Sequence, residues 1–299
     1  MVEPLTQMPK APETKAESNP LKKYYRQPAI YIKLPSGGQF YNSDSFTKTE
    51  TGELGVFPMT AKDEMAFKTP DGLINGQSTV DVIESCIPNI KNAWKVVNHD
   101  VDVILLAIRI ATYGETMDVT GTVPGTSESV THTVNLPAML EQVNQVKIVD
   151  NFITESGFQI KVRPMDYKTI TETQQSAFEQ QKQYAALATR TDLDDRAKGE
   201  QFSKNFKKLT EMNFDVLRRS IMQIRTPDGV EVNDQSQIAD FLNNVDRKIV
   251  TEIQKGLTDN RNQAALPPVK MKATEEQIKK GAPANYDMPL TFDAANFFV

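Results

Sequence analysis

Cysteine and histidine are scarce in this 299-residue sequence. Its one cysteine, Cys86, cannot form an intramolecular disulfide bond. The two histidines, His99 and His132, are together with Cys86 too few for a standard structural zinc site. We therefore expect neither a metal ion nor a cofactor.

Long apolar segments are also missing from the sequence. No stretch reaches the roughly 20 apolar residues that a membrane-spanning helix needs. The N-terminus lacks the apolar core of a secretory signal peptide. We therefore expect no membrane partner, and a protein that is made and used in a reducing cytoplasm.

The charge pattern gives no sign of a nucleic-acid partner. The formal net charge is −5, and acidic and basic residues are interspersed along the chain. Proteins that bind nucleic acids concentrate Lys and Arg on one face, where they neutralise phosphates. The sequence therefore predicts no binding to nucleic acid.

Residues 98–114 (NHDVDVILLAIRIATYG) are the stretch around which the rest is organised. Asp100 has the chemistry of a helix N-cap, and Gly114 stands where a C-cap belongs. Only Asp102 and Arg109 interrupt the apolar run, so the helix should be buried on most of its circumference. The apolar residues at helical spacing are Val101, Ile104, Leu105, Ile108 and Ala111.

The segments before this helix are short. Residues 1–23 are charged and Pro-containing and predict a flexible arm. Residues 29–34 and 52–57 read as strands. Thr60 should cap a short helix, with Asp63 completing a capping box.

Another helix is expected after residue 77. Ser78 or Thr79 is the predicted N-cap, and Pro88 ends the helix. Cys86 lies on its apolar side and is most simply a small core residue.

After Gly114 the pattern becomes β-like. Residues 117–123 and 130–136 predict a hairpin, and residues 137–143 a short helix. Two further strands are expected at 146–154 and 158–163.

The region 166–264 is predicted to be helical. Two long helices, 166–188 and 201–224, are joined by a charged link and suggest an α-hairpin. Ser236 and Asp246 should cap two more helices, and residues 256–268 form a loop. The apolar faces assigned to the long helices are Ile170, Ala177, Phe178, Tyr184 and Leu187, and then Phe202, Phe206, Leu209, Phe214, Leu217 and Ile221.

These patterns predict an α+β fold. A mixed N-terminal domain around a buried helix is followed by long helices and a short β-like C-terminal segment. The expected divisions are a flexible arm at 1–23, a mixed domain at 24–165, a helical region at 166–264, and strands with an aromatic tail at 265–299.

No catalytic residue emerges from the sequence. Adjacent carboxylates are common, but on polar helices such neighbours are usually caps or solvated groups. His99 has no serine or cysteine nucleophile near it in the sequence, which favours a structural or surface role. The glycines at 37 and 38 lack the P-loop pattern, so a phosphate site is not expected.

The C-terminal segment is unusual because two aromatic residues stand directly before the last residue, Val299. Chain ends are normally polar and fray. Phe297 and Phe298, after Asn296, suggest a segment that docks in a groove, either within the chain or on a partner. Together with Phe40 and Tyr41 they are the predicted partner-binding residues.

Five segments together resemble a known family. They are residues 34–41 (LPSGGQFY), 55–64 (GVFPMTAKDE), 73–76 (LING), 109–114 (RIATYG) and 296–298 (NFF). In that order they resemble the baseplate hub and tail-assembly proteins of T4-type, contractile-tailed bacteriophages. Relatives often carry Cys-x-x-Cys pairs in small zinc ribbons. Residues 117–136 and 269–292 contain no cysteine, so the resemblance implies the hairpin without its metal.

The resemblance implies a structural or assembly protein of a phage tail baseplate or hub, acting by protein contacts and without an enzymatic step. Its partners would be other tail and baseplate proteins, including hub or tape-measure proteins, in a symmetric hetero-oligomer. It would be assembled in the host cytoplasm and reside in the virion. Two alternatives stay open: a transient tail-assembly chaperone that is absent from the virion, and a hub-associated cell-wall hydrolase.

Overall fold

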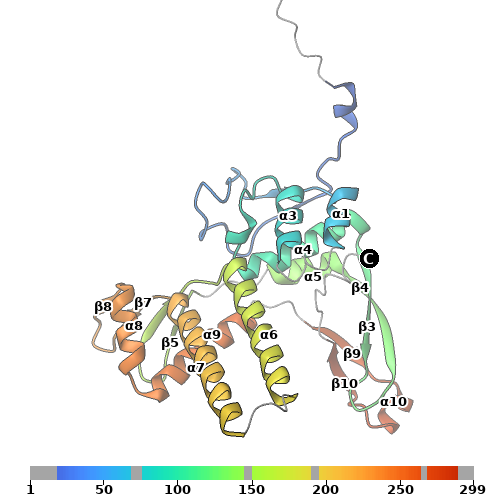
Figure 1. The fold of residues 1–299 in the computed structure, drawn as a ribbon. Coiled ribbons are helices and arrows are strands. Elements are labelled where there is room, and N and C mark those ends of the chain that lie inside the picture. The colour runs from blue at the N-terminus through green and yellow to red at the C-terminus, as the bar shows by residue number, and fades with distance from the viewer. Residues whose placement is uncertain (1–18, 69–75, 145–149, 190–194, 264–267, 289–299) are drawn as a thin grey trace, which may run out of the picture.

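The computed structural model describes residues 19–68, 76–144, 150–189, 195–263 and 268–288. It confirms the predicted α+β class: helices combine with small antiparallel sheets (Figure 1). The helices are η1 (Pro20–Tyr24), α1 (Ala61–Phe67), α3 (Gln77–Cys86), η2 (Ala93–Lys95), α4 (Asn98–Tyr113), α5 (Leu136–Asn144), α6 (Tyr167–Thr189), α7 (Asp195–Ser220), α8 (Gln235–Asn244), α9 (Arg247–Gln263) and α10 (Glu275–Lys279). The strands are β1 (Ile30–Ile32), β2 (Leu54–Val56), β3 (Thr116–Thr122), β4 (Ser129–Asn135), β5 (Asn151–Ile153), β6 (Gln159–Val162), β7 (Ile221–Arg225), β8 (Glu231–Val232), β9 (Val269–Lys272) and β10 (Asn285–Met288).

Helix α4 is buried as predicted, and Gly114 ends it with a positive φ of 95°. The predicted N-cap is wrong. The helix begins at Asn98 after Val97, so Asp100 lies inside its first turn. The start is fixed by a crossing segment, because the Asn98 amide donates to the Met165 carbonyl at 3.0 Å. Asp100 is thereby free to turn its side chain toward another part of the chain.

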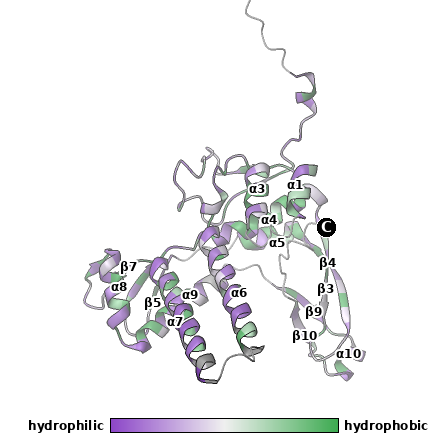
Figure 2. Ribbon diagram, viewed as in Figure 1, coloured by the Kyte–Doolittle hydropathy of each residue, from purple (hydrophilic) through white to green (hydrophobic). Residues whose placement is uncertain are grey.

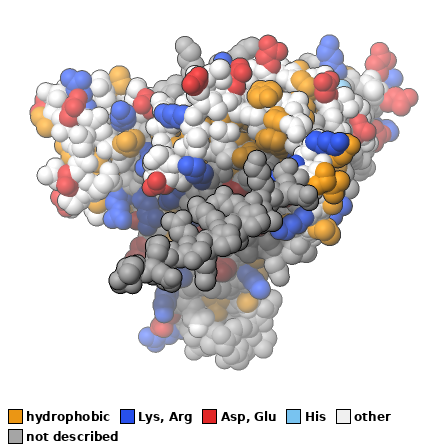
Figure 3. All heavy atoms as spheres, turned by 90° about the horizontal axis from the view of Figure 1, so that it is seen from above, with side chains coloured by type: hydrophobic (Ala, Val, Ile, Leu, Met, Phe, Trp, Pro, Cys, Tyr) orange, Lys and Arg blue, Asp and Glu red, His pale blue; other side chains and the backbone are white. Residues whose placement is uncertain are grey.

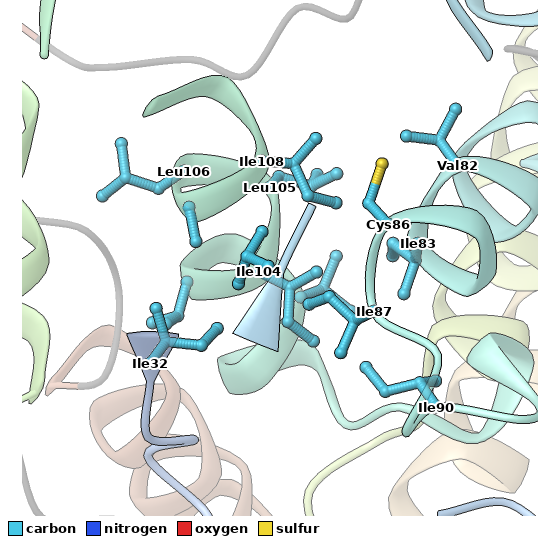
Figure 4. Close-up of a cluster of buried hydrophobic side chains, with 14 of the residues drawn as sticks. Ile32, Val82, Ile83, Cys86, Ile87, Ile90, Ile104, Leu105, Leu106 and Ile108 are labelled. Atoms are coloured by element: carbon cyan, nitrogen blue, oxygen red, sulfur yellow. The ribbon is translucent and has the colours of Figure 1, made fainter. Parts of the chain in front are cut away.

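The largest core surrounds α4 and is closed by α3, α5 and the β1–β2 pair. Figure 4 shows α4 side chains facing those of α3 and the turn after it. Cys86 is fully buried there, which confirms its reading as a core residue. Burying one such aliphatic side chain stabilises the fold by about 1.5–3 kcal/mol. The labelled core residues are Ile32, Val82, Ile83, Cys86, Ile87, Ile90, Ile104, Leu105, Leu106 and Ile108.

The predicted capping box of α1 is confirmed. The Asp63 amide donates to the Thr60 hydroxyl at 3.2 Å, and the Thr60 amide donates to the Asp63 carboxylate at 2.8 Å. The two side chains, three residues apart, thus satisfy the backbone amides of Thr60 and Asp63 at this helix end.

The predicted cap of α3 is wrong. Gly76, at φ 77°, precedes the helix, and no side chain caps it. Ser78 and Thr79 lie within the first turn, and the Ser78 hydroxyl donates to the Ala66 carbonyl at 2.8 Å. The serine therefore joins α3 to α1 instead of capping α3.

The predictions for α8 and α9 are partly wrong. Asp234, and not Ser236, caps α8, because its carboxylate accepts from the amides two and three residues ahead. Asp246 stands before α9 as expected, and its carboxylate accepts from the Lys248 amide at 2.6 Å. The helix then continues to Gln263, through the first half of the predicted loop at 256–268. Residues 264–267 lie outside the described residues.

The last residues of the helix predicted at 201–224 form a strand of a four-stranded sheet instead. Helix α7 starts earlier than expected and ends at Ser220, and β7 follows directly. The sheet order is β5-β6-β7-β8, so it pairs strands from both sides of the predicted boundary at residue 165. Ile221 and Ile224 point into a second core shared with α7, α8 and α9. Their spacing of three suits a helix. Both can face the core from the strand because the register of the β6–β7 pair shifts between Lys161 and Val162.

Helices α6 and α7 form the predicted α-hairpin and lie side by side (Figure 1). Their apolar faces are only partly buried. Leu187 and Leu217 are buried, but Phe178 and Phe206, which belong to the same predicted apolar faces, are 63% and 66% exposed. Figure 2 shows that hydrophilic residues make up most of both helices.

The C-terminal β9–β10 hairpin packs on the β3–β4 hairpin. Strands β9 and β10, with α10 between them, cover one side of the β3–β4 hairpin (Figure 1). Val123 and Tyr286 share a small buried cluster, and Lys280 pairs with Glu128. Described residues from the predicted C-terminal segment therefore contact the predicted N-terminal domain.

Alanine substitutions at two helical glycines should have opposite effects on stability. A Cβ at Gly256 in α9 would lie 2.2 Å from the Phe152 ring, whereas nothing lies within 4 Å of a Cβ at Gly199 in α7. Gly256→Ala should lower the free energy of unfolding by about 1–3 kcal/mol through overpacking. Gly199→Ala should raise it by about 0.5–1 kcal/mol. Urea denaturation measures both, and equal stabilities would contradict this packing.

Candidate functional site

The loop at residues 35–41 carries two of the predicted partner-binding residues. Gly37 and Gly38 have φ values of 59° and 72°, which side chains with a Cβ rarely adopt. This double left-handed turn folds the loop back onto the start of α4. The Gly38 amide donates to the Ser36 hydroxyl at 3.1 Å and holds the turn.

Asp100 is the point at which the loop meets α4. Its side chain is completely buried and accepts hydrogen bonds from the Ser36 amide at 2.9 Å, the Ser36 hydroxyl and the Tyr41 hydroxyl. The Tyr41 oxygen in turn accepts from the Val97 amide at 3.1 Å. One carboxylate therefore links the loop, the aromatic residue after it and the helix start.

Burial raises the pKa values of both ionisable side chains in this network, Asp100 and Tyr41. Burial raises the pKa of Asp100, and the hydrogen bonds from Ser36 and Tyr41 oppose that rise. Burial and the nearby Asp100 charge also raise the pKa of Tyr41, so its hydroxyl stays protonated and donates. The arrangement fixes structure and leaves no free nucleophile or base.

The structure describes two of the five predicted partner-binding residues. Tyr41 is half-buried, and its hydroxyl is fully used within the molecule. Phe40 is also half-buried, and its carbonyl accepts from Arg163 at 3.4 Å. Asn296, Phe297 and Phe298 lie outside the described residues. That these five residues bind a partner stays a prediction.

Exposed aromatic residues near the N-terminus were missed by the sequence reasoning. Leu21, Tyr24, Tyr25 and Tyr31 are all more than half exposed, and Tyr24 reaches 73%. The Lys23 amine lies 4.8 Å from the centre of the Tyr24 ring. The signal for this basic and aromatic segment was the run of two lysines and two tyrosines at 22–25.

Phe178 on α6 and Phe206 on α7 form a second set of exposed aromatic groups. Figure 3, which views the molecule from above, likewise shows hydrophobic side chains in small groups between charged ones. These side chains lie on different elements and do not gather into one patch. Each presents a large apolar area that a partner could remove from water, so they are candidate anchors for separate contacts.

A cleft of about 730 Å³ lies beside the start of α4, and we call it the α4 cleft. Its walls come from α4, the β6–α6 connection, α6, α7 and α9. His99 and Asp102 line it from α4, and His132 lies elsewhere on β4. The other lining residues are Asn98, Val162, Arg163, Pro164, Met165, Ile170, Thr173, Gln174, Asn213, Val216, Leu217, Ser220, Gln254, Leu257, Thr258, Asn260 and Asn262.

Two ionisable side chains of α4 line the α4 cleft. Both ring nitrogens of His99 are buried without a hydrogen-bond partner, and burial lowers the pKa of this histidine. Asp102 is only partly buried, and this burial raises its pKa to about 6. Buried polar atoms such as the His99 nitrogens are normally paired.

The α4 cleft holds no recognisable catalytic constellation in the described part of the chain. Ser220 lines it, but its hydroxyl donates to the Val216 carbonyl at 2.8 Å and not to His99. Within the described ranges, no group of three or more His, Cys, Asp or Glu side chains is placed to hold a metal ion. None of the helices described is long and apolar enough to cross a membrane.

A comparison with protein families places most of the chain in a known family. The family model described as T4 bacteriophage base plate protein matches residues 28–280. This range contains the 35–41 loop, α4, the α4 cleft and the α6–α7 hairpin. No curated protein and no solved structure matches the chain.

The two carboxylates of α4 predict opposite mutational effects. Asp100→Asn should lower the free energy of unfolding at pH 8 by at least about 2 kcal/mol, because its buried donors lose a charged acceptor. Asp102→Asn should raise it at pH 8, because it removes a charge whose formation the folded state opposes.

The effect of Asp102→Asn on stability depends on pH. The pKa of Asp102 in the folded state, about 6, lies above the ordinary value of 3.8, so folding opposes its ionisation. Wild-type stability therefore falls as the pH rises from 4 through 6, relative to Asp102→Asn. The difference should be negligible below pH 4 and on the order of 2–3 kcal/mol at pH 8. Urea titrations across this range test it, and a pH-independent difference would contradict it.

Proposed function

This chain belongs to the T4 bacteriophage base plate protein family, and on that premise we propose that it helps to build the baseplate hub through protein contacts, without a catalytic step. The family assignment makes it a structural protein of the phage baseplate, located in the virion tail and in contact with other tail proteins. Its place at the hub, its assembly in the host cytoplasm and its membership of a symmetric hetero-oligomer are parts of the proposal.

The observation that carries the proposal is the set of exposed aromatic anchors on a folded core. Phe178 and Phe206 stand on an otherwise hydrophilic hairpin, and Tyr24 and Tyr25 on the segment before β1. Aromatic side chains dominate the energetics of protein interfaces, because each removes a large apolar area from water. Anchors on two separate elements suit a protein that bridges neighbouring subunits.

The same anchors also suit a transient chaperone that binds hub or tape-measure proteins and then leaves. Quantitative mass spectrometry of purified mature virions and of infected-cell lysate separates the two roles. A baseplate component is retained in virions at a fixed small ratio to other tail proteins. Abundance in the lysate together with absence from virions would contradict the resident role and favour the chaperone.

The hydrolase alternative has a separate test. Zymography on peptidoglycan with the purified chain should give no cleared band. A band that one carboxylate substitution abolishes would overturn the proposal of a non-catalytic role.

The anchors of the α6–α7 hairpin provide the mutational prediction. The double variant Phe178→Ser and Phe206→Ser should reduce incorporation into virions at least about tenfold, since each buried Phe contributes about 1.5–3 kcal/mol. The control is Gln181→Ser and Lys208→Ser, which changes exposed polar residues on the same helices and should leave incorporation unchanged. Equal incorporation of both double variants would exclude this hairpin as a contact surface.

A further inference from the structure

We propose that residues 289–299 dock on the C-terminal end of α4, where the Asp293 carboxylate pairs with the guanidinium group of Arg109. This inference goes beyond the proposed function, because it concerns a contact within the chain and needs no partner protein. The sequence leaves two docking modes open for the aromatic C-terminal segment, and this inference selects the one within the chain.

The first argument is an incomplete arginine site on α4. Arg109 is only 7% exposed, yet its Nε and Nη1 atoms are buried without a hydrogen-bond partner among the described residues. Its guanidinium carbon lies 4.5 Å from the centre of the Tyr113 ring. The ring attracts the positive charge but cannot replace the in-plane acceptors of a guanidinium group. Buried charges are normally paired, which leaves the acceptor to be supplied from outside the described residues.

The second argument is the place where the described chain ends. Met288, the last residue of β10, pairs with Val269, which packs against the core around α4. A Cβ at Gly121 in β3 would lie 3.0 Å from the Met288 sulfur. Strand β3 begins at Thr116, shortly after the end of α4 (Figure 1). The end of β10 therefore lies beside the strand that leads back to α4.

The direction of β10 carries the chain toward the same point. Tyr286 shares a cluster with Val123, beyond the far end of β3, whereas the last residue of β10 lies against Gly121. Strand β10 thus runs toward the start of β3. The eleven residues at 289–299 span about 36–40 Å when extended, and the eight residues from Gly121 back to Tyr113 span at most about 26–29 Å. The segment is therefore long enough to reach the end of α4.

The third argument is charge complementarity. Residues 289–299 contain one acidic residue, Asp293, and no lysine or arginine. Asp293 stands five residues after Met288, about 17 Å along an extended chain, and the long side chain of Arg109 narrows the remaining distance. A carboxylate offers two oxygens that match the planar fork of a guanidinium group.

Apolar groups at the same end of α4 suit the aromatic part of the segment. Tyr113, in the last turn of α4, is 37% exposed, and Met65 on α1 is 66% exposed. Burial raises the pKa of Tyr113, and so does the nearby Glu64 carboxylate, so the helix that carries Met65 lies beside this tyrosine. Phe297 and Phe298 would remove part of this apolar area from water.

The test measures amide hydrogen exchange of the full chain by mass spectrometry, on a peptide that covers 289–299. Asp293→Asn removes the proposed charge with little change of shape, and Arg109→Met removes its partner. The matched control is Asp71→Asn, which removes the single carboxylate of residues 69–75.

We expect the peptide of the wild-type chain to exchange at least about tenfold more slowly than an unstructured peptide of the same sequence. Asp293→Asn should reduce this protection at least about fivefold, and adding Arg109→Met to it should cause no further loss. Asp71→Asn should leave the protection unchanged. The comparison of wild type, Asp293→Asn and Asp71→Asn does not require Arg109→Met to fold.

Exchange of 289–299 at the unstructured rate in the wild-type chain would overturn the proposal, and so would protection that Asp293→Asn leaves intact. An equal loss in Asp71→Asn would overturn it as well, because the protection would then not depend on Asp293 in particular. Each of these results leaves the proposed function standing, since retention of the chain in virions tests that function separately.

Discussion

The burial of one carboxylate is the constraint on which this structure depends. Asp100 can remain inside the core only because the 35–41 loop brings Ser36 and Tyr41 to it. The same contact fixes the start of α4, since the Val97 amide donates to the Tyr41 hydroxyl. The residues around Val97 pair with those around Asp166, which places the first turn of α6. The α4 core, the α6–α7 hairpin and the α4 cleft are therefore positioned by one hydrogen-bonded junction.

Much of the fold could be predicted from the sequence where its cause is local. The capping box at Thr60, the C-cap at Gly114 and the hairpin at 116–135 depend on residues close together in the chain. The strand β7 could not be predicted in the same way. Its isoleucines continue the apolar spacing of α7, and only pairing with β6, about sixty residues earlier, makes the chain leave the helix. A helical spacing in the sequence is therefore overridden where a distant strand pairs with the segment.

In the candidate site, too, contacts between distant parts of the chain could not be predicted from the sequence. Asp100 and Asp102 have the same side chain on the same helix, and the sequence predicts one as a helix N-cap and the other as an interruption of the apolar run. Their different environments arise because Ser36, far away in the chain, reaches Asp100, whereas Asp102 lines the α4 cleft. The exposure of Phe178 and Phe206 could not be predicted either, because a helical apolar spacing does not reveal whether another element covers that face of the helix. The family resemblance, carried by short segments in order, was confirmed by the match over residues 28–280.

The central claim is that this chain is a folded α4-centred core which contacts other baseplate proteins through exposed anchors. A cryo-electron microscopy reconstruction of intact phage tails tests it most directly. The account predicts density for the core within the baseplate, with the α6–α7 hairpin and residues 19–25 against neighbouring subunits. A reconstruction in which the chain is present and both elements face solvent would contradict the account.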